Sequence, residues 1–243
     1  MKAVAIIPAR MGSSRFPGKP LAQILGRPMI QWVYEGTKAC GSLARVIIAT
    51  CDAEIEAAAR AFGAQVVMTS PRHERASDRV AEAAAALNTD VVVMVQGDEP
   101  MVVPAMIEEA LRPFDDPAVD CTNLSSAIDT EADFHDVNTV KVVVNRRGDA
   151  LYFSRAPVPS FSRRDGGSVL GHRQVCVIGF RATFLQRYTQ LEPTALERSE
   201  SIDMLRILEH GFAVRIVPTS STSYPVDTEA DRRRVEQLLA GRR

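Results

Sequence analysis

Three cationic side chains stand close together near the start of the chain, in the stretch ARMGSSRFPGKP that covers residues 9–20. Arg10, Arg15 and Lys19 share it with small residues such as Ser13, which let backbone N–H groups approach an anion. Neither the spacing of a Walker A loop nor that of a GxGxxG fingerprint is present. The stretch therefore predicts a site for a polyphosphate, the alternative being a solvated basic loop.

Two aspartates offer oxygen ligands for a hard divalent cation. Asp98 lies in VQGDEP at 95–100, directly after an apolar run, and Asp227 lies in YPVDTEAD, just before a predicted helix. Such carboxylates suit Mg²⁺. Glu99 could share the role, but adjacent side chains leave a loop in different directions, so we prefer Asp98. Asp227 alone could be an acid favoured by the helix dipole. Together with the cationic loop, the two aspartates predict a metal-bound nucleotide.

The elements that must position these side chains alternate between strand and helix in the first half. The apolar runs show no polar alternation, so each predicted strand is covered on both faces, as in a parallel sheet with right-handed crossovers. Residues that follow parallel strands meet at one edge of the sheet. The predicted fold class is α/β, with a doubly wound, mostly parallel, Rossmann-like sheet. Strands are expected at 3–7, 45–50, 64–68 and 90–95, and helices from Pro28, from a cap at Asp52 to Gly63, and from a cap at Ser77 to Leu87.

The second half is predicted to add a mixed-sheet extension or small lobe. Its strands are not separated by helices, and a stretch rich in Pro, Ser, Gly and Arg predicts an exposed loop. No linker divides the chain, so we expect a single domain over 1–243. The expected elements are strands at 139–144, 150–154, 174–180 and 213–217, the loop 155–172, a helix around 199–211, and a last helix capped by Thr228 and Asp231.

The composition argues against several kinds of partner. The 243 residues carry 29 Lys and Arg against 30 Asp and Glu, and a net charge of -1 gives no reason to expect nucleic acid. No apolar stretch approaches the ~20 residues that span a bilayer, so no membrane partner is expected. Four cysteines without a CxxC pair, and no signal peptide ahead of them, indicate reduced thiols and a cytoplasmic location.

Five stretches follow one another along the chain: IIPARMGSSRFPGKPL, MVQGDEPMV, VNTVKVVV, ALYFSRAPVP and PVDTEAD. In this order they resemble the cytidylyltransferases that activate the acid sugar 3-deoxy-manno-octulosonate (Kdo), over residues 3 to about 240. The first stretch is shared more loosely with sialic-acid cytidylyltransferases. The resemblance implies a CTP- and Mg²⁺-dependent enzyme that forms CMP-Kdo and pyrophosphate for lipopolysaccharide or capsule biosynthesis, usually as a homodimer. On this basis we assign about 114–223 as an acceptor and dimerisation sub-region.

The resemblance also implies roles for individual residues. Arg10, Lys19, Asp98 and Asp227 would be catalytic, the two aspartates as ligands of Mg²⁺. On the acceptor side, Arg155 matches the family and suits a carboxylate. The residues assigned to CTP are Arg10, Ser13, Arg15, Lys19, Ser77, Arg79 and Gln96.

The acceptor side departs from the family pattern in two segments. A family segment of about RHxGIYxYR is RQVCVIGFR here, at 173–181, and an LEQLR-like segment is IDMLR at 202–206. Lost hydrogen bonds to sugar hydroxyls could redirect specificity, for instance to 8-amino-Kdo through pairing with Asp203. A different small acid, a phosphonate, or a non-catalytic nucleotide-binding role stay as alternatives. The changed positions are Gln174, Cys176, Ile178, Asp203 and Met204.

Overall fold

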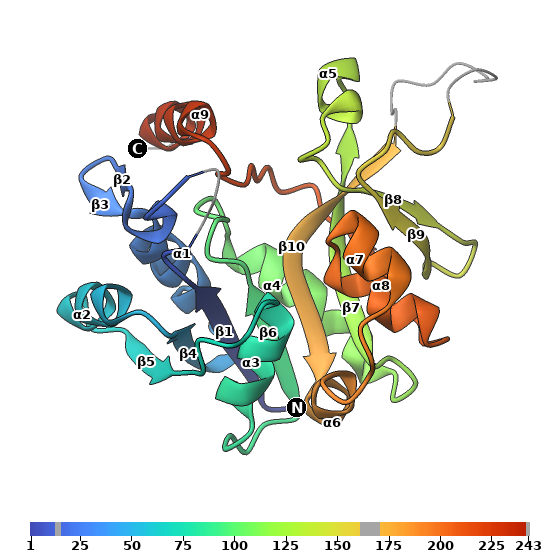
Figure 1. Ribbon diagram of the computed structural model, residues 1–243, viewed down its shortest axis with the longest axis horizontal. Helices are drawn as coiled ribbons and strands as arrows, with labels where there is room; N and C mark the ends of the chain where they lie inside the picture. The colour runs from blue at the N-terminus through green and yellow to red at the C-terminus, as the bar shows by residue number, and fades with distance from the viewer. Residues whose placement is uncertain (13–15, 161–170, 242–243) are drawn as a thin grey trace.

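One mixed β-sheet runs through the molecule, with helices on both of its faces (Figure 1). The computed structural model describes residues 1–12, 16–160 and 171–241. The strands of this sheet are β1 (Ala3–Ala9), β4 (Leu43–Thr50), β5 (Gln65–Met68), β6 (Val91–Val95), β7 (Cys121–Ile128), β8 (Lys141–Val144), β9 (Ala150–Ser154), β10 (Gly171–Arg181) and β11 (Arg215–Pro218). Their order in the described part of the chain is β11-β7-β10-β6-β1-β4-β5, and β8 and β9 extend the sheet from β10.

The first half is parallel, as its apolar runs predict. β1 pairs in parallel with β4 and β6, and β4 pairs in parallel with β5. The helices that cover the sheet are α1 (Met29–Lys38), α2 (Ala53–Ala61), α3 (Ala76–Ala84), α4 (Pro104–Leu111), α6 (Ala182–Tyr188) and α8 (Asp203–Glu209). Alternate residues of β1 point to opposite faces, so Ile7 joins the core with α1, α2 and α4, whereas Ile6 joins the core with α3, α6 and α8. This three-layer arrangement confirms the predicted fold class.

The second half is mixed, as expected. β10 runs antiparallel to β6, β7 and β8, whereas β11 runs parallel to β7. The remaining elements are β2 (Gln23–Ile24), β3 (Arg27–Pro28), α5 (Glu131–His135), α7 (Ala195–Glu200), α9 (Glu229–Ala240) and the 3-10 turns η1 (Lys19–Leu21) and η2 (Arg112–Asp115). α9 returns to the N-terminal half, where Val235 and Leu239 pack in one cluster with Ile24 and Met29 (Figure 1).

The helix expected around 199–211 is present as α8, but it begins only at Asp203, and residues 199 and 200 belong to the end of α7. Ser201 takes the left-handed conformation, with φ of 55°, and ends α7. Ile202 is extended and buried, and α8 begins after it. The strand β7 was not predicted, since its sequence CTNLSSAI buries polar residues that hide the apolar pattern.

Two predicted helix caps also differ from the structure. Asp52 occupies the cap position of α2, but its side chain makes no capping bond there. Ser77 lies inside α3, whose cap position is Arg75. The capping box of Thr228 and Asp231 at α9 is confirmed.

The single domain over 1–243, the sub-region at about 114–223 and the cytoplasmic location stay predictions. Within the described residues, each helix is too short or too polar to cross a bilayer.

Candidate active site

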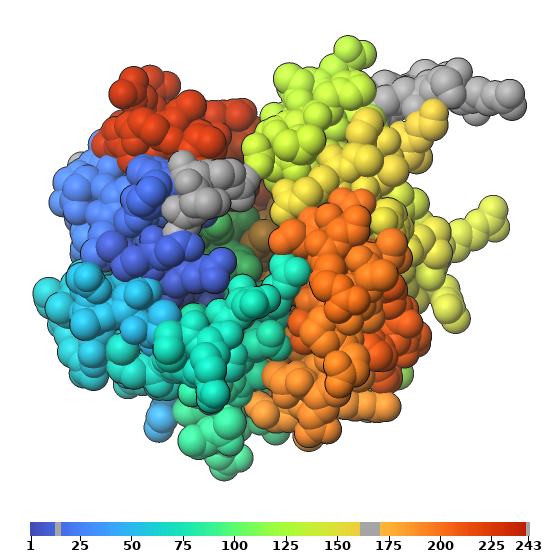
Figure 2. Space-filling view, viewed as in Figure 1, coloured from blue at the N-terminus to red at the C-terminus, as the bar shows by residue number. Residues whose placement is uncertain are grey.

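Two adjoining cavities open at the edge of the sheet where β1 and β6 end. Figure 2 shows the molecule hollowed here, between the blue-to-teal first half and the yellow-to-orange second half. The β1 cavity is lined by Arg10, Lys19, Glu74, Arg75, Arg79 and Gly97, among others, and the β10 cavity by Asn138, Arg155, Arg173, Gln174, Ile178 and Met204, among others. Gln96, Asp98 and Asp227 line both cavities. Ligands bound in the two cavities would therefore meet at these three residues.

Lys19 lies at this meeting point. Its Nζ is 2.7 Å from Asp98 Oδ2 and 3.1 Å from Asp227 Oδ1. Burial lowers the pKa of Lys19, but Asp98 and Asp227 outweigh burial, so the pKa is raised and the ammonium stays charged. Gly18, with φ of 70°, precedes the η1 turn that carries Lys19. One cation thus joins two carboxylates from distant parts of the chain.

A glycine allows the turn after β6 to bring Asp98 to this point. A Cβ on Gly97 would lie 2.8 Å from the backbone oxygen of Pro8 in β1, too close for a real side chain. The backbone oxygen of Asp98 accepts a hydrogen bond from Val226 N at 2.9 Å. This bond holds the segment 223–227, which ends in Asp227, against the turn. The backbone therefore sets the separation of the two aspartates.

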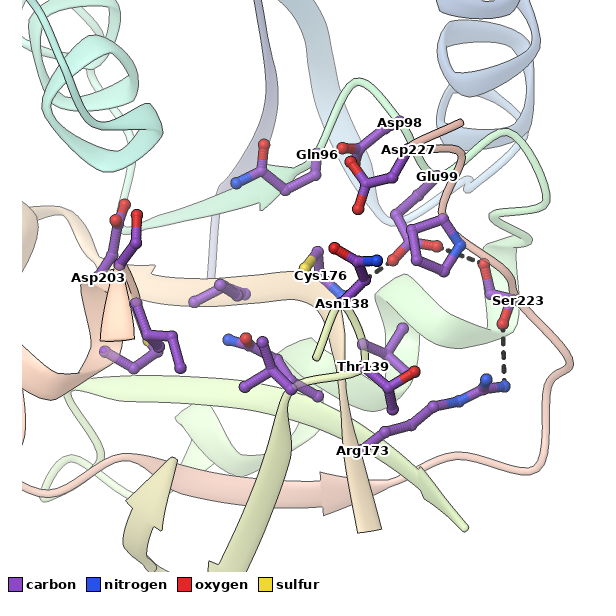
Figure 3. Close-up of a pocket in the computed structure, with 18 of the residues that line it drawn as sticks. Gln96, Asp98, Glu99, Asn138, Thr139, Arg173, Cys176, Asp203, Ser223 and Asp227 are labelled. Atoms are coloured by element: carbon purple, nitrogen blue, oxygen red, sulfur yellow. Dashed lines mark hydrogen bonds between the residues drawn. The ribbon is translucent and has the colours of Figure 1, made fainter. Parts of the chain in front are cut away.

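Glu99, next to Asp98, is buried and stabilises the same turn through hydrogen bonds. Its carboxylate accepts hydrogen bonds from Ser223 Oγ and, at 3.2 Å, from Cys176 N (Figure 3). Burial raises its pKa to about 7, although the Ser223 bond opposes that shift. Arg173 donates to the backbone oxygen of Ser223 at 3.1 Å, so one series of bonds joins β10, the segment 223–227 and the turn. These bonds favour Asp98 over Glu99 as a cation ligand.

The two aspartates fit a site for Mg²⁺. Asp98 and Asp227 present oxygen atoms to one cation, and their side chains are 24% and 18% exposed, so solvent and ligands can reach them. Mg²⁺ is commonly held by one or two carboxylates, while water and phosphate oxygens complete its shell. Among residues 1–12, 16–160 and 171–241, no group of three or more His, Cys, Asp and Glu side chains could hold a metal. A cation here would depend on a ligand for its other oxygen atoms.

The start of the predicted anion-binding loop is fixed after β1. Arg10 is exposed and lines the β1 cavity. Met11 N donates to Asp52 Oδ2 at 2.8 Å, which explains why that carboxylate does not cap α2. Ser13 and Arg15 lie outside the described residues. The loop thus offers at least one cation to the cavity from an anchored backbone.

The other residues predicted to bind the nucleotide have different surroundings. Gln96 and Arg79 line the β1 cavity. Arg79 is almost fully buried and donates to Thr69 Oγ1, so its main role is to support the cavity wall. Ser77 is fully buried and is not among the residues that line either cavity, so its assignment to the nucleotide stays a prediction. Its hydroxyl bonds to Asp203 Oδ2 at 2.6 Å, so Ser77 orients a residue of the other cavity.

All of the predicted acceptor residues line the β10 cavity: Arg155, Gln174, Ile178, Asp203 and Met204. Ile178 and Met204 are buried and form an apolar part of the wall. Gln174 Nε2 donates to Asn123 Oδ1 at 2.6 Å, which turns that end of the amide toward β7. The wall therefore combines apolar surface with side chains that are already oriented.

Arg155 is held by backbone groups. Its Nε donates to the backbone oxygen of Glu200 at 2.7 Å and its Nη1 to that of Val137 at 2.9 Å. Lys141 is fully buried and donates to the backbone oxygen of Arg155 at 2.7 Å, and also to those of Asp136 and Thr139. The buried ammonium of Lys141 thus ties the segment 136–139 to the backbone of Arg155.

Among the lining residues that sequence reasoning missed are four with polar side chains: Arg75, Asn138, Thr139 and Arg173. Three of them stand in stretches that carried the resemblance or its departures, VNTVKVVV and RQVCVIGFR, so a signal was present. Arg75 stands just before ASDRVAE and has no such signal. Its place in the site follows only from how α3 faces α7 and α8.

The chain is similar to known cytidylyltransferases over nearly its whole length. A family model described as cytidylyltransferase matches residues 4–216. The 3-deoxy-manno-octulosonate cytidylyltransferase of Geobacter metallireducens is 46% identical, over 99% of this chain and 98% of that protein. The protein of the same name from Geotalea uraniireducens is 44% identical, over 98% of this chain and 99% of that protein.

Solved structures give the same result. A structure of CMP:2-keto-3-deoxy-manno-octonic acid synthetase complexed with CTP has a TM-score of 0.92 at 40% identity, and the match covers all of both chains. A cytidylyltransferase from Leptospira borgpetersenii has a TM-score of 0.67 at 17% identity, over 99% of this chain and 87% of that chain, and is similar in fold alone.

Proposed function

Because this chain belongs to the cytidylyltransferase family, we propose that it transfers CMP from CTP to the anomeric hydroxyl of Kdo and releases pyrophosphate. One observation carries this proposal: the two cavities meet at Asp98 and Asp227, which hold the ammonium group of Lys19 between them. The enzyme is a CTP-dependent 3-deoxy-manno-octulosonate cytidylyltransferase, and its product serves lipopolysaccharide biosynthesis.

CTP binds in the β1 cavity, with its phosphates toward the cationic loop. Arg10 neutralises the phosphate that is attacked, and Arg15 and Lys19 stabilise the outer phosphates as negative charge develops on the leaving pyrophosphate. Gln96 lies at the end of β6, between the nucleotide and the acceptor. The exposed side chain of Arg10 and the charged ammonium of Lys19 in this cavity support the assignment.

The acceptor binds in the β10 cavity, where its carboxylate faces Arg155. Its anomeric hydroxyl attacks the α-phosphorus, and pyrophosphate leaves in line, so no covalent enzyme intermediate is needed. Most of the rate then comes from orientation of the two substrates and from stabilisation of charge. The bonds that fix Arg155 and Lys141 support a wall that positions the acceptor.

Asp98 and Asp227 hold Mg²⁺ when the nucleotide is present. The ion supplies Lewis acidity, which lowers the pKa of the attacking hydroxyl and offsets charge at the α-phosphate. Lys19 contacts the same two carboxylates in this structure. Nucleotide binding therefore moves its ammonium from the aspartates to the outer phosphates.

The surroundings of Asp203 favour Kdo over 8-amino-Kdo as the acceptor. Ser77 already donates to Asp203 Oδ2 at 2.6 Å, and Arg75 Nε lies 3.8 Å from Oδ1. An amine of the acceptor would have to compete with both groups. The changed positions in the two departing segments are therefore another way of holding the same sugar, with a buried apolar wall at Ile178 and Met204.

A pyrophosphate-release assay with CTP and Mg²⁺ tests the function and the acceptor together. We expect Kdo to have a kcat/KM at least about tenfold above 8-amino-Kdo, N-acetylneuraminate and a small phosphonate, which is about the net effect of one hydrogen bond. A higher kcat/KM for another acid would contradict the assignment of Kdo as the acceptor. Binding of CTP without turnover of any acid would favour the non-catalytic alternative.

The enzyme acts as a cytoplasmic homodimer in this proposal. Val137, beside β8, and Leu151, in β9, are 62% and 59% exposed, and both lie in the sub-region at about 114–223. Exposed apolar side chains in this sub-region suit a contact between copies. Light scattering of the purified protein would measure its mass, and Leu151→Asp should lower that mass if β9 takes part in the dimer contact.

A further inference from the structure

Arg75 connects the walls of the two cavities. It is the residue before the first turn of α3, and it lines the β1 cavity. Its Nη1 donates to Ser201 Oγ at 2.8 Å, and its Nη2 donates to the backbone oxygen of Glu197 at 3.4 Å. Its Nε lies 3.4 Å from Glu197 Oε1 and 3.8 Å from Asp203 Oδ1. One guanidinium thus reaches from the β1 cavity to the turn between α7 and α8.

This turn forms part of the other cavity. Ser201, Ile202, Asp203 and Met204 all line the β10 cavity. Ser201 has a left-handed backbone, with φ of 55°, which residues other than glycine adopt only when their surroundings hold them. The hydroxyl that Arg75 binds belongs to this residue. The guanidinium therefore supports a position of the wall that has a left-handed backbone.

The groups behind the turn are rigid. Glu197 is fully buried, and Arg206 donates to it twice, at 2.6 and 2.8 Å. Asp203 is held from α3 by Ser77 at 2.6 Å. Arg75 is the more exposed group, at 21% against 0% for Glu197 and 4% for Arg206. Arg75 is therefore the accessible support of this turn, and it lies in front of a buried ion pair.

We infer that Arg75 is a positioning residue that shapes the acceptor wall through its contact with Ser201. This inference rests on the proposed function, because it takes the β1 cavity for CTP and the β10 cavity for the acceptor. A direct nucleotide ligand would affect the KM for CTP. A residue that acts through the acceptor wall affects the KM for the acceptor.

Steady-state kinetics of Arg75→Gln and Arg75→Lys separate these roles. We expect Arg75→Gln to raise the acceptor KM about tenfold, the effect of losing one hydrogen bond to a charged group. The kcat at saturating acceptor and the KM for CTP should stay within about threefold of wild type, since uniform binding of the acceptor is what is lost. Arg75→Lys keeps the charge and should recover part of the acceptor KM.

A matched control comes from the same loop. Arg72 is exposed, bonds locally to Ser70 and lines neither cavity, so Arg72→Gln removes an equal charge without touching the turn. Its kinetics should equal those of wild type. A double-mutant cycle with Ser201→Ala tests whether Arg75 acts through its contact with Ser201. In the Ser201→Ala background, Arg75→Gln should change the acceptor KM by about threefold or less, because the contact is already gone.

Each outcome decides between the roles. An Arg75→Gln variant whose KM rises for CTP but not for the acceptor would make Arg75 a nucleotide ligand and overturn the inference. Full additivity with Ser201→Ala would also overturn it. If Arg75→Gln does not fold, Ser201→Ala alone must raise the acceptor KM for the inference to hold. Failure of the wild type to turn over Kdo would instead contradict the proposed function.

Discussion

The replacement Lys19→Met removes the cation at the meeting point of the two cavities and keeps most of the apolar stem. Its ammonium lies 2.7 Å from Asp98 Oδ2 and 3.1 Å from Asp227 Oδ1. If this ammonium moves to the outer phosphates of CTP, the variant should bind CTP more weakly, while its affinity for CMP, which lacks those phosphates, should change little.

The size of the effect follows from the contacts that are exchanged. A hydrogen bond to a charged group contributes about 1.5–3 kcal/mol, or roughly a 10- to 150-fold change in affinity. Lys19 must first give up two carboxylate contacts, so we expect a loss near the lower end, about tenfold for CTP. The two carboxylates also lose their own cation. Without nucleotide, the variant should therefore bind a divalent cation at least about tenfold more tightly than wild type.

Two binding measurements check this reasoning. Isothermal titration calorimetry gives the affinities for CTP and CMP at fixed Mg²⁺. The electron paramagnetic resonance signal of free Mn²⁺ gives the affinity for a divalent cation without nucleotide. Lys38→Met is the control, because Lys38 is exposed at the end of α1 and lies over the ring of Tyr34. It should leave all three affinities unchanged.

Equal losses for CTP and CMP would refute the assignment of Lys19 to the outer phosphates. Unchanged Mn²⁺ affinity in Lys19→Met would refute the idea that the ammonium and a metal ion compete for Asp98 and Asp227.

Three further predictions concern the groups around this lysine. Asp98→Asn or Asp227→Asn should lower kcat/KM at least ~100-fold in the pyrophosphate assay without changing the thermal midpoint, and near-normal turnover in both variants would exclude them as metal ligands. Gly97→Ala should lower the free energy of unfolding by about 1–3 kcal/mol in urea titrations, because its Cβ would lie 2.8 Å from a backbone oxygen of β1, and wild-type stability would show that β1 can move aside. Lys141→Met should cost about 3 kcal/mol or more by the same measurement, since it removes the buried ammonium that donates to three backbone carbonyls, and a loss below about 1 kcal/mol would mean that water replaces the ammonium.

Several parts of the fold and site could be predicted because they depend on residues close together in sequence. β1, β4, β5 and β6 are short apolar runs bounded by turn residues, and such runs form parallel strands, although β5 lies at the edge of the sheet and is not buried. The end of a parallel strand is a place where ligands bind, so Arg10 after β1 and Asp98 after β6 were expected at one edge.

Other parts could not be predicted, because local signals pointed elsewhere. Serine is a residue type that often caps helices, yet Ser77 lies inside α3 and its hydroxyl donates a hydrogen bond to Asp203. The run from 199 to 211 has helical spacing, but it breaks at Ser201, where burial of Ile202 and the contact with Arg75 outweigh helix propensity.

By itself, the sequence determined the chemistry at the site: a cationic loop, two carboxylates and the strands that carry them to one edge of a sheet. Only the tertiary structure decided which of these groups touch. Lys19 lies between Asp98 and Asp227, and Arg75 reaches Ser201, through contacts between residues that are 79 to 208 positions apart in the sequence. Local propensity does not encode such pairings, since they arise when the packing of β1 against β6 and of α3 against α8 fixes where the side chains end.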